Sequence, residues 1–156
     1  MNRFKILLLF FLLLAINNAS AIESGINVYG FSYHPDRTDS KGNGFQEWNP
    51  GIGYHATLRN ARHFILFADT GVFVNSLSKP TVFSSAGAEL KIHGGLSAGL
   101  YGAFIYSKAY NSGKPIVAPL PSVSYRYHQF RFNATYFPKY KQNDNAAFGF
   151  SFTWFP

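Results

Sequence analysis

Residues 62–92 form the stretch that most constrains how this chain can fold. Apolar and polar side chains alternate along it with a period of two, which is typical of strands with one apolar and one polar face. The alternation stops between Asn75 and Pro80, where Asn, Ser, Lys and Pro favour a turn. The stretch therefore predicts a β-hairpin. One face would carry Phe64, Leu66, Ala68, Val72, Val74, Val82, Ala86, Ala88, Leu90 and Ile92, and the other His63, Asp69, Gly71, Asn75, Ser85, Gly87, Glu89 and Lys91.

The first residues have the composition of a secretory signal peptide. Two basic residues precede an apolar run over residues 6–16, and small residues follow at 19–21. This order is typical of export signals, and the apolar run is too short for a membrane-spanning helix. We therefore expect cleavage after Ala21, with residues 22–156 as one domain.

The composition favours a protein whose outer face meets lipid. Aromatic residues make up 19% of the chain and charged residues 13%, whereas soluble domains carry about 25% charged residues. The net charge of +7 could also suit nucleic acid, but an exported chain meets an anionic lipid surface instead. The chain has no cysteine, so no disulfide stabilises the fold.

Six further stretches alternate like the arms of the hairpin, although the first has apolar residues in both registers. With the two arms they give eight strands, and no helical period competes with them. The even-numbered strands lead into the next through short turns, and the odd-numbered strands through longer loops. This asymmetry is typical of bacterial outer-membrane barrels. The sequence therefore predicts an all-β fold, an eight-stranded antiparallel transmembrane β-barrel, as a monomer in the outer membrane of a Gram-negative bacterium. The six stretches are residues 26–34, 48–59, 96–107, 116–127, 130–137 and 147–155.

Inward-facing residues divide into two layers by depth. Near the short turns they mix both signs of charge, as in Arg59, Glu89, Lys91 and Arg131, and such buried charges must pair. Nearer the long loops they are small or apolar, which predicts a well that holds one acyl chain. An alternative is that the glycines serve packing alone. The residues expected to form the well and its rim are Gly53, Gly71, Phe73, Gly87 and Lys79.

Pro119 and Pro121 lie within the sixth predicted strand. Proline has no N–H for the strand ladder, so it weakens pairing where it lies. We expect a local gap in the barrel wall, a lateral gate through which a lipid enters. The alternative is that the prolines only mark loop boundaries.

His34 ends the first strand, and Asn75 and Ser76 follow the third, so all three would lie at the outer end of the barrel. A histidine near a serine hydroxyl is the pairing used for base-assisted acyl transfer. A histidine beside a loop can also simply be solvated. The five histidines show no metal-ligand spacing, so we expect no metal or other cofactor.

Four segments resemble the outer-membrane lipid A palmitoyltransferase family. They are Tyr33-His34, Phe73-Val74-Asn75-Ser76 followed by Pro80, the run from Pro119 to Tyr125, and Thr135-Tyr136-Phe137-Pro138. The resemblance implies an enzyme that moves a palmitoyl chain from a phospholipid donor to lipid A. It implies that His34 is the general base and that Ser76 carries the hydroxyl on which, or through which, His34 acts. Asn75 would be an orienting or oxyanion-stabilising amide. The chain departs from the family in having Asn75 in place of Asp, no N-terminal amphipathic helix and a shorter first loop, so it resembles a shortened relative.

Two other functions remain open at the level of sequence. One is a non-catalytic outer-membrane barrel with a structural or adhesive role, in which His34 and Ser76 are ordinary loop residues. The other is a lipid A deacylase, which ranks last because its usual His-x-Ser arrangement on one strand is absent.

Overall fold

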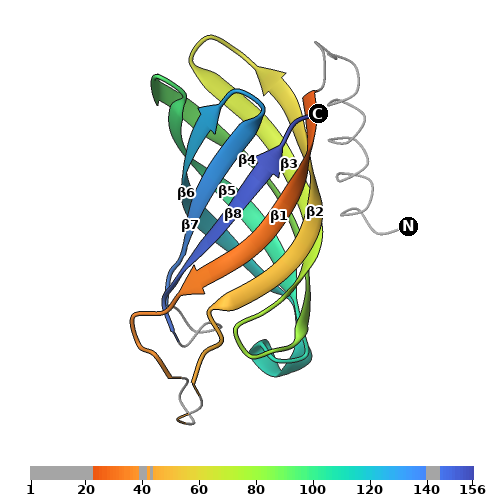
Figure 1. Ribbon diagram of the computed structural model, residues 1–156. Coiled ribbons are helices and arrows are strands. Elements are labelled where there is room, and N and C mark those ends of the chain that lie inside the picture. Colours follow the sequence, from red (N-terminus) through yellow and green to blue (C-terminus); the bar gives the residue numbers. More distant parts are fainter. Residues whose placement is uncertain (1–22, 39–41, 43, 140–144) are drawn as a thin grey trace, which may run out of the picture.

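The computed structural model describes residues 23–38, 42, 44–139 and 145–156. The predicted signal peptide, residues 1–21, lies outside them. The described chain is built from eight strands and one short 3-10 helix (Figure 1). None of the described residues belongs to a helix that is long and apolar enough to cross a membrane. The elements are β1 (Glu23–Tyr33), β2 (Trp48–Asn60), β3 (Phe64–Val74), β4 (Pro80–His93), β5 (Leu96–Tyr106), η1 (Asn111–Gly113), β6 (Ile116–Tyr127), β7 (Phe130–Phe137) and β8 (Ala147–Trp154).

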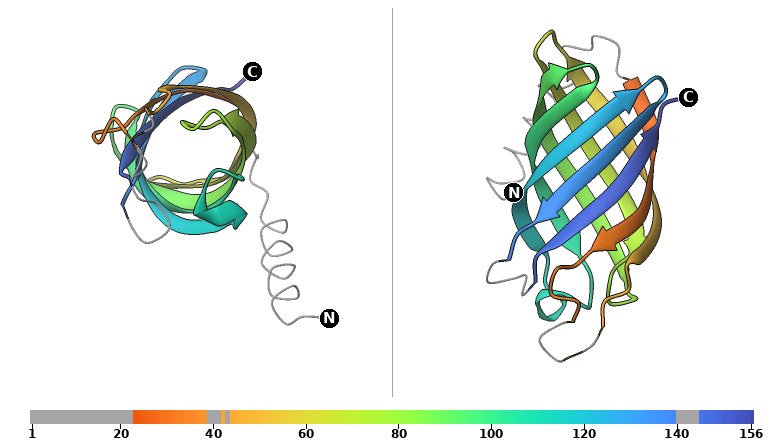
Figure 2. Two further views of the ribbon diagram at one scale, coloured as in Figure 1. Left: turned by 90° about the horizontal axis from the view of Figure 1, so that it is seen from below. Right: turned by 60° about the vertical axis from the view of Figure 1, so that its left-hand side comes forward.

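Each strand pairs antiparallel with the next, and β1 pairs with β8, so the sheet closes into a barrel. Seen along its axis, the barrel is a ring of strands (Figure 2). The predicted all-β, eight-stranded antiparallel barrel is therefore confirmed. The long connections all lie at one end and the short turns at the other (Figure 1).

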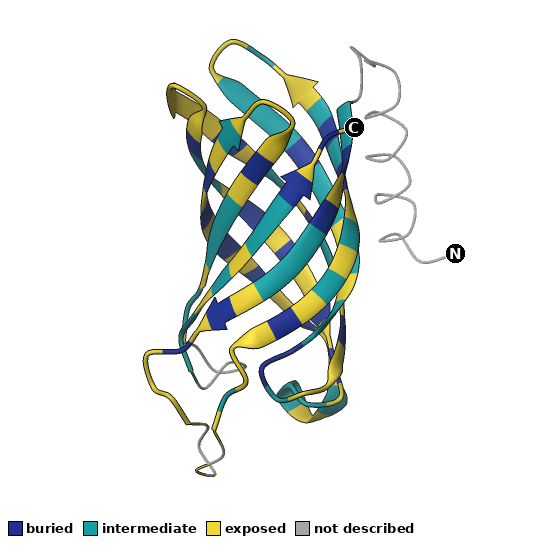
Figure 3. Cartoon of the chain, in the orientation of Figure 1, coloured by how far each residue is buried: buried dark blue, intermediate teal, exposed yellow. Residues whose placement is uncertain are grey.

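Buried and more exposed residues alternate along the strands (Figure 3), because successive side chains of a strand point to opposite faces of the sheet. On β6, Val123 and Tyr125 are exposed, whereas Ser122 and Ser124 are buried. Exposed apolar side chains of this kind surround the barrel, and lipid covers such a surface in membrane barrels. They include the aromatics Phe148, Phe150 and Trp154 of β8, together with Ile52, Val72, Leu90, Leu100, Phe104, Val117, Phe132 and others.

A β-bulge in β1 explains why both registers of this strand carry apolar residues. The pairing of β1 with both neighbours shifts between Tyr29 and Phe31. Before the shift Asn27 is buried, and after it Ser32 is buried, so the inward set changes from odd to even positions. A bulge re-aims side chains in this way, and it brings His34 to the inner side of the barrel mouth.

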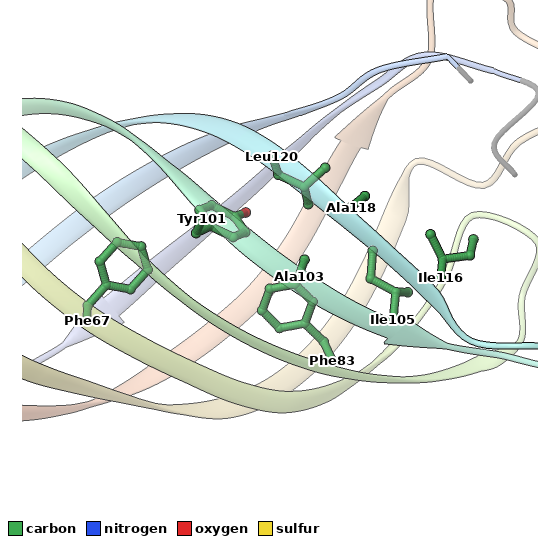
Figure 4. Close-up of a cluster of buried hydrophobic side chains, with 8 residues drawn as sticks. All are labelled: Phe67, Phe83, Tyr101, Ala103, Ile105, Ile116, Ala118 and Leu120. Carbon is green, nitrogen blue, oxygen red and sulfur yellow. The ribbon is translucent and has the colours of Figure 1, made fainter. Parts of the chain in front are cut away.

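The inward faces of β3 to β6 carry an apolar cluster along one side of the lumen (Figure 4). Its members come from four consecutive strands because alternation places every second residue inside. They are Phe67, Phe83, Tyr101, Ala103, Ile105, Ile116, Ala118 and Leu120.

Paired ionisable groups close the lumen toward the short turns. Arg131 binds Glu89 at 2.5 Å, and His55 binds Asp69 at 2.8 Å. The buried charge of Arg131 is therefore paired with that of Glu89, as buried charge requires. The prediction was wrong for Arg59 and Lys91, which are exposed at the end of the barrel, where the neighbouring ladders shift register.

Candidate functional site

A cavity of about 830 Å³ occupies the lumen between the ionisable layer and the long connections. It extends from Ser76 and Lys79 at the rim down to Glu89 and Arg131. Seen along the barrel axis, the connection between β3 and β4 leans inward over the opening (Figure 2). The volume is in the range of small-molecule sites in proteins.

The two sides of this cavity differ in polarity. The side formed by β3 to β6 is largely apolar, with Phe67, Phe83 and Tyr101 among its lining residues. The side formed by β7, β8, β1 and β2 is mostly polar, and its lining residues include Asn133, Thr135, Ser151, Asn27, Ser32 and Asn49. A molecule in the cavity therefore meets apolar groups on one flank and hydrogen-bonding groups on the other.

His34 lies just after β1 at the mouth of the cavity and is 7% exposed. Its ring stacks on Phe45 with 4.1 Å between centroids. Its Nδ1 is buried and makes no hydrogen bond in the described part of the chain. Burial lowers the pKa of His34 below its usual value, and the nearby carboxylate of Glu47 opposes this shift in part. The ring is therefore a neutral base at neutral pH.

Ser76 is buried at the same mouth, in the connection between β3 and β4. Its Oγ shares a hydrogen bond with Ser32 Oγ at 3.1 Å and accepts one from Asn49 Nδ2 at 3.5 Å. Its backbone carbonyl accepts from the N–H of Gln46 at 2.9 Å. Among the described residues no hydrogen bond joins His34 to Ser76, so the structure places the two at one opening without direct contact.

Asn75 shapes the connection rather than facing the cavity, which it does not line. Its Oδ1 accepts from the backbone N–H groups of Leu77 at 2.9 Å and Lys79 at 3.1 Å. Its Nδ2 donates to Thr81 and Ser107, each at 3.0 Å. The amide is thus fully used in holding the segment that carries Ser76.

The glycines predicted to leave open space face inward, but aromatic side chains occupy that space. A Cβ on Gly53 would lie 2.7 Å from the Tyr29 hydroxyl, and one on Gly71 would lie 2.7 Å from the Tyr29 ring. A Cβ on Gly87 would lie 2.3 Å from that of Tyr101. None of the three glycines lines the cavity, and their contacts match the packing interpretation. Of the other residues predicted for the well, Phe73 lines the cavity wall and Lys79 its rim.

The wall beside Pro119 and Pro121 is paired on one side only. The ladder between β5 and β6 runs unbroken past both prolines, whereas the ladder between β6 and β7 begins only at Ser122. A proline keeps its place in a ladder only if its nitrogen points away from that partner. The missing N–H groups therefore belong to the side toward β7. In the half of the barrel nearer the long connections, the described residues of β6 and β7 are not paired with each other.

Sequence reasoning missed part of the polar lining of the cavity. Asn27 and Tyr29 were hidden by the ambiguous face of the first strand. Ser122 counted only as part of a motif, although it lies two residues before Ser124 and therefore on the same inward face. Extending that alternation toward the mouth would have identified it.

Comparison with known proteins bears on the fold alone. No family model matches the chain, and no curated protein is significantly similar to it in sequence. A solution NMR structure of the de novo designed protein TMB2.3 is similar in structure, with a TM-score of 0.56 at 11% sequence identity. The match covers 87% of this chain and 96% of the designed one.

Proposed function

We propose that this protein is an outer-membrane acyltransferase that moves a palmitoyl or similar chain from a phospholipid to lipid A. The observation that carries the proposal is the placement of His34 and Ser76 at the mouth of one lumenal cavity, where His34 Nδ1 makes no hydrogen bond with the described residues. The exposed apolar wall suits a bilayer. The four sequence segments that resemble the palmitoyltransferase family support the same reading.

In the proposed reaction His34 takes the proton from a hydroxyl of the acceptor. The acceptor oxygen then attacks the ester carbonyl of the phospholipid, and the bond from this carbonyl to the glycerol oxygen breaks. The glycerol oxygen leaves with the proton from His34, which restores the neutral ring. The Ser76 hydroxyl donates to the oxyanion that forms in between.

Asn75 acts as a positioning residue in this scheme. Its four hydrogen bonds hold the segment from Leu77 to Thr81 and join it to Ser107, which directly follows β5. The donor chain enters through the unpaired stretch between β6 and β7. Lys79 at the rim and the exposed Lys108 bind phosphate groups of the lipids.

The proposal is tested by mass spectrometry of lipid A from cells with and without the gene. We expect a species heavier by one acyl chain that disappears in the His34→Ala and Ser76→Ala strains. Ser84→Ala, the same change on the outer wall, is the matched control and should keep the species. Retained acylation in both site variants would sink the proposed site.

A non-catalytic barrel is the second candidate function. The hydrogen bonds of the Ser76 hydroxyl favour this function. They join Ser76 to Ser32 and Asn49, and among the described residues no hydrogen bond joins Ser76 to His34. Under this reading the lipid A profile does not change, although the protein is a folded barrel by its heat-modifiable gel mobility. A species lighter by one chain would instead indicate a deacylase.

A further inference from the structure

The end of the barrel with the short turns carries exposed cations without a carboxylate partner. Arg59 lies near the end of β2, Arg62 lies in the turn between β2 and β3, and Lys91 lies near the end of β4. All three residues are exposed, and none of them forms a salt bridge within the described part of the chain. Residues 58–66 and 90–100, which include both turns, contain no Asp or Glu.

These three cations gather on one patch of surface because β2, β3 and β4 are neighbouring strands. Lys91 Nζ donates to the side chain of Asn60, the residue after Arg59, at 2.5 Å. The backbone N–H of Lys91 donates to the carbonyl of His63, the residue after Arg62, at 2.9 Å. We call Arg59, Arg62 and Lys91 the basic cluster.

A β-bulge in β2 turns Arg59 onto the outer wall. The register with β3 shifts between Thr57 and Arg59, so that Arg59 pairs with Leu66. Thr57 is buried inside, whereas Leu66 faces outward because the next residue, Phe67, is buried in the lumen. Residues paired across a ladder share a face of the sheet, so Arg59 faces outward with Leu66. Its Cζ lies 5.4 Å from the centre of the Phe64 ring.

The apolar wall ends beside the basic cluster. Phe64 pairs with Leu90, which is 66% exposed, and Ile92 is 61% exposed. A charge on the lipid-facing wall is costly in the hydrocarbon region of a bilayer and is tolerated near the interface. Arg59 therefore marks the level of the wall at which lipid headgroups begin.

Phosphate is the anionic group of a phospholipid at that level. A guanidinium donates paired N–H groups to phosphate oxygens, and an ammonium adds a compact positive charge. A zwitterionic headgroup brings its own cation to its phosphate, whereas an anionic headgroup leaves the phosphate to the protein. We propose that the basic cluster binds the phosphate of an anionic phospholipid in the leaflet on the short-turn side. The proposal requires a barrel in a bilayer and is independent of whether the barrel is an acyltransferase.

Fluorescence quenching by brominated lipids in reconstituted bilayers tests this proposal. A reporter chain carries Trp48→Phe, Trp154→Phe and Leu90→Trp, so its one tryptophan lies on the outer wall beside the cluster. In mixtures of phosphatidylglycerol and phosphatidylcholine, each lipid in turn carries brominated chains, and the two quenching levels give their relative binding constant at this position. We expect phosphatidylglycerol to bind about fivefold tighter, the factor that one cation near a membrane surface contributes. The preference should shrink in 1 M salt, where the Debye length is about 3 Å.

The variant Arg59→Gln/Arg62→Gln/Lys91→Gln of the reporter chain should lose the preference. Its heat-modifiable gel mobility shows whether it is still a folded barrel. Equal binding of the two lipids to the reporter chain, a preference that 1 M salt does not change, or one that survives in the folded triple variant would overturn the proposal and leave the cluster to the aqueous phase.

The matched control removes the same charge from the other end of the barrel. The variant Arg37→Gln/Lys114→Gln/Lys139→Gln changes three exposed residues of the long connections and should keep the preference. If it loses the preference as well, the effect comes from the net charge of the whole chain, and the basic cluster is not a site. Lipid binding is measured without turnover, so its outcome is separate from that of the His34→Ala and Ser76→Ala strains.

Discussion

Glu89 and Arg131 join β4 to β7 across the lumen, with 2.5 Å between Oε1 and Nη2. Both side chains are almost fully buried, and Ser124 donates to the second carboxylate oxygen at 2.9 Å. The two strands are not neighbours in the sheet. The ion pair therefore links parts of the barrel wall that are not adjacent, and it closes the end of the cavity that faces the short turns.

Glu89→Ala is expected to lower the free energy of unfolding by about 3–5 kcal/mol, because it leaves the Arg131 guanidinium buried without its partner. Urea unfolding in micelles, followed by tryptophan fluorescence, measures this loss. Replacing the whole pair, with Glu89→Leu and Arg131→Met, should recover most of the stability. A loss no larger than that of the exposed control Lys91→Ala would contradict this role of the ion pair.

Alternation and turn residues predicted the barrel and most inward positions, because a period of two is a local property of each strand. Glu89 and Arg131 were correctly placed inside from this pattern alone. Bulges were not predictable in this way, so the inward set of β1 and the exposure of Arg59 were missed. The site required contacts between distant strands: Asn75 bonds with Ser107, and Ser76 with Ser32, which spacing along the chain does not indicate.

Gly71→Ala is expected to destabilise the barrel by about 1–3 kcal/mol, the usual cost of overpacking. The new Cβ would lie 2.7 Å from the Tyr29 ring and 2.8 Å from the carbonyl oxygen of Ile52. Gly102→Ala is the matched control, since its Cβ would meet nothing within 4 Å. Urea unfolding of both variants checks the difference. Adding Tyr29→Ala should remove the part of the conflict that comes from the ring, so the two changes should not be additive.

Asn75→Ala is expected to cost about 1–3 kcal/mol, because it leaves buried groups of the β3–β4 connection without their hydrogen bonds. Ser107→Ala removes one of the same bonds. A double-mutant cycle should therefore give a total loss smaller than the sum of the two single losses. Fully additive losses would show that the bond between Asn75 and Ser107 contributes nothing to stability.

The pH dependence of acyl transfer follows from the lowered pKa of His34. Its neutral form is the base, so activity should persist at neutral pH and decline only as pH falls through a value below the usual histidine pKa of about 6.5. The unfolded chain binds this proton more readily, so the stability that neutral His34 contributes is fully present above the unfolded pKa of about 6.5 and is lost as pH falls through the lowered pKa of the folded chain. Glu47→Gln should move the acid limb of the pH–rate profile lower, because Glu47 raises this pKa. An acid limb above 6.5 in the unchanged chain would contradict the assignment of His34 as base.

A disulfide across the unpaired wall tests lipid entry between β6 and β7. The chain has no native cysteine, so Pro121→Cys with Tyr136→Cys creates a single bridge just beyond the last pair, Ser122 and Thr135. We expect the oxidised protein to lose acyl transfer from phospholipid and to regain it on reduction. The control bridge joins Val123→Cys to Ala134→Cys, which are already paired in the ladder, and should leave transfer unchanged in both states. If the oxidised Pro121→Cys/Tyr136→Cys protein is as active as the reduced one, the donor reaches the cavity by another route, and the rim between His34 and Lys79 becomes the entrance to examine.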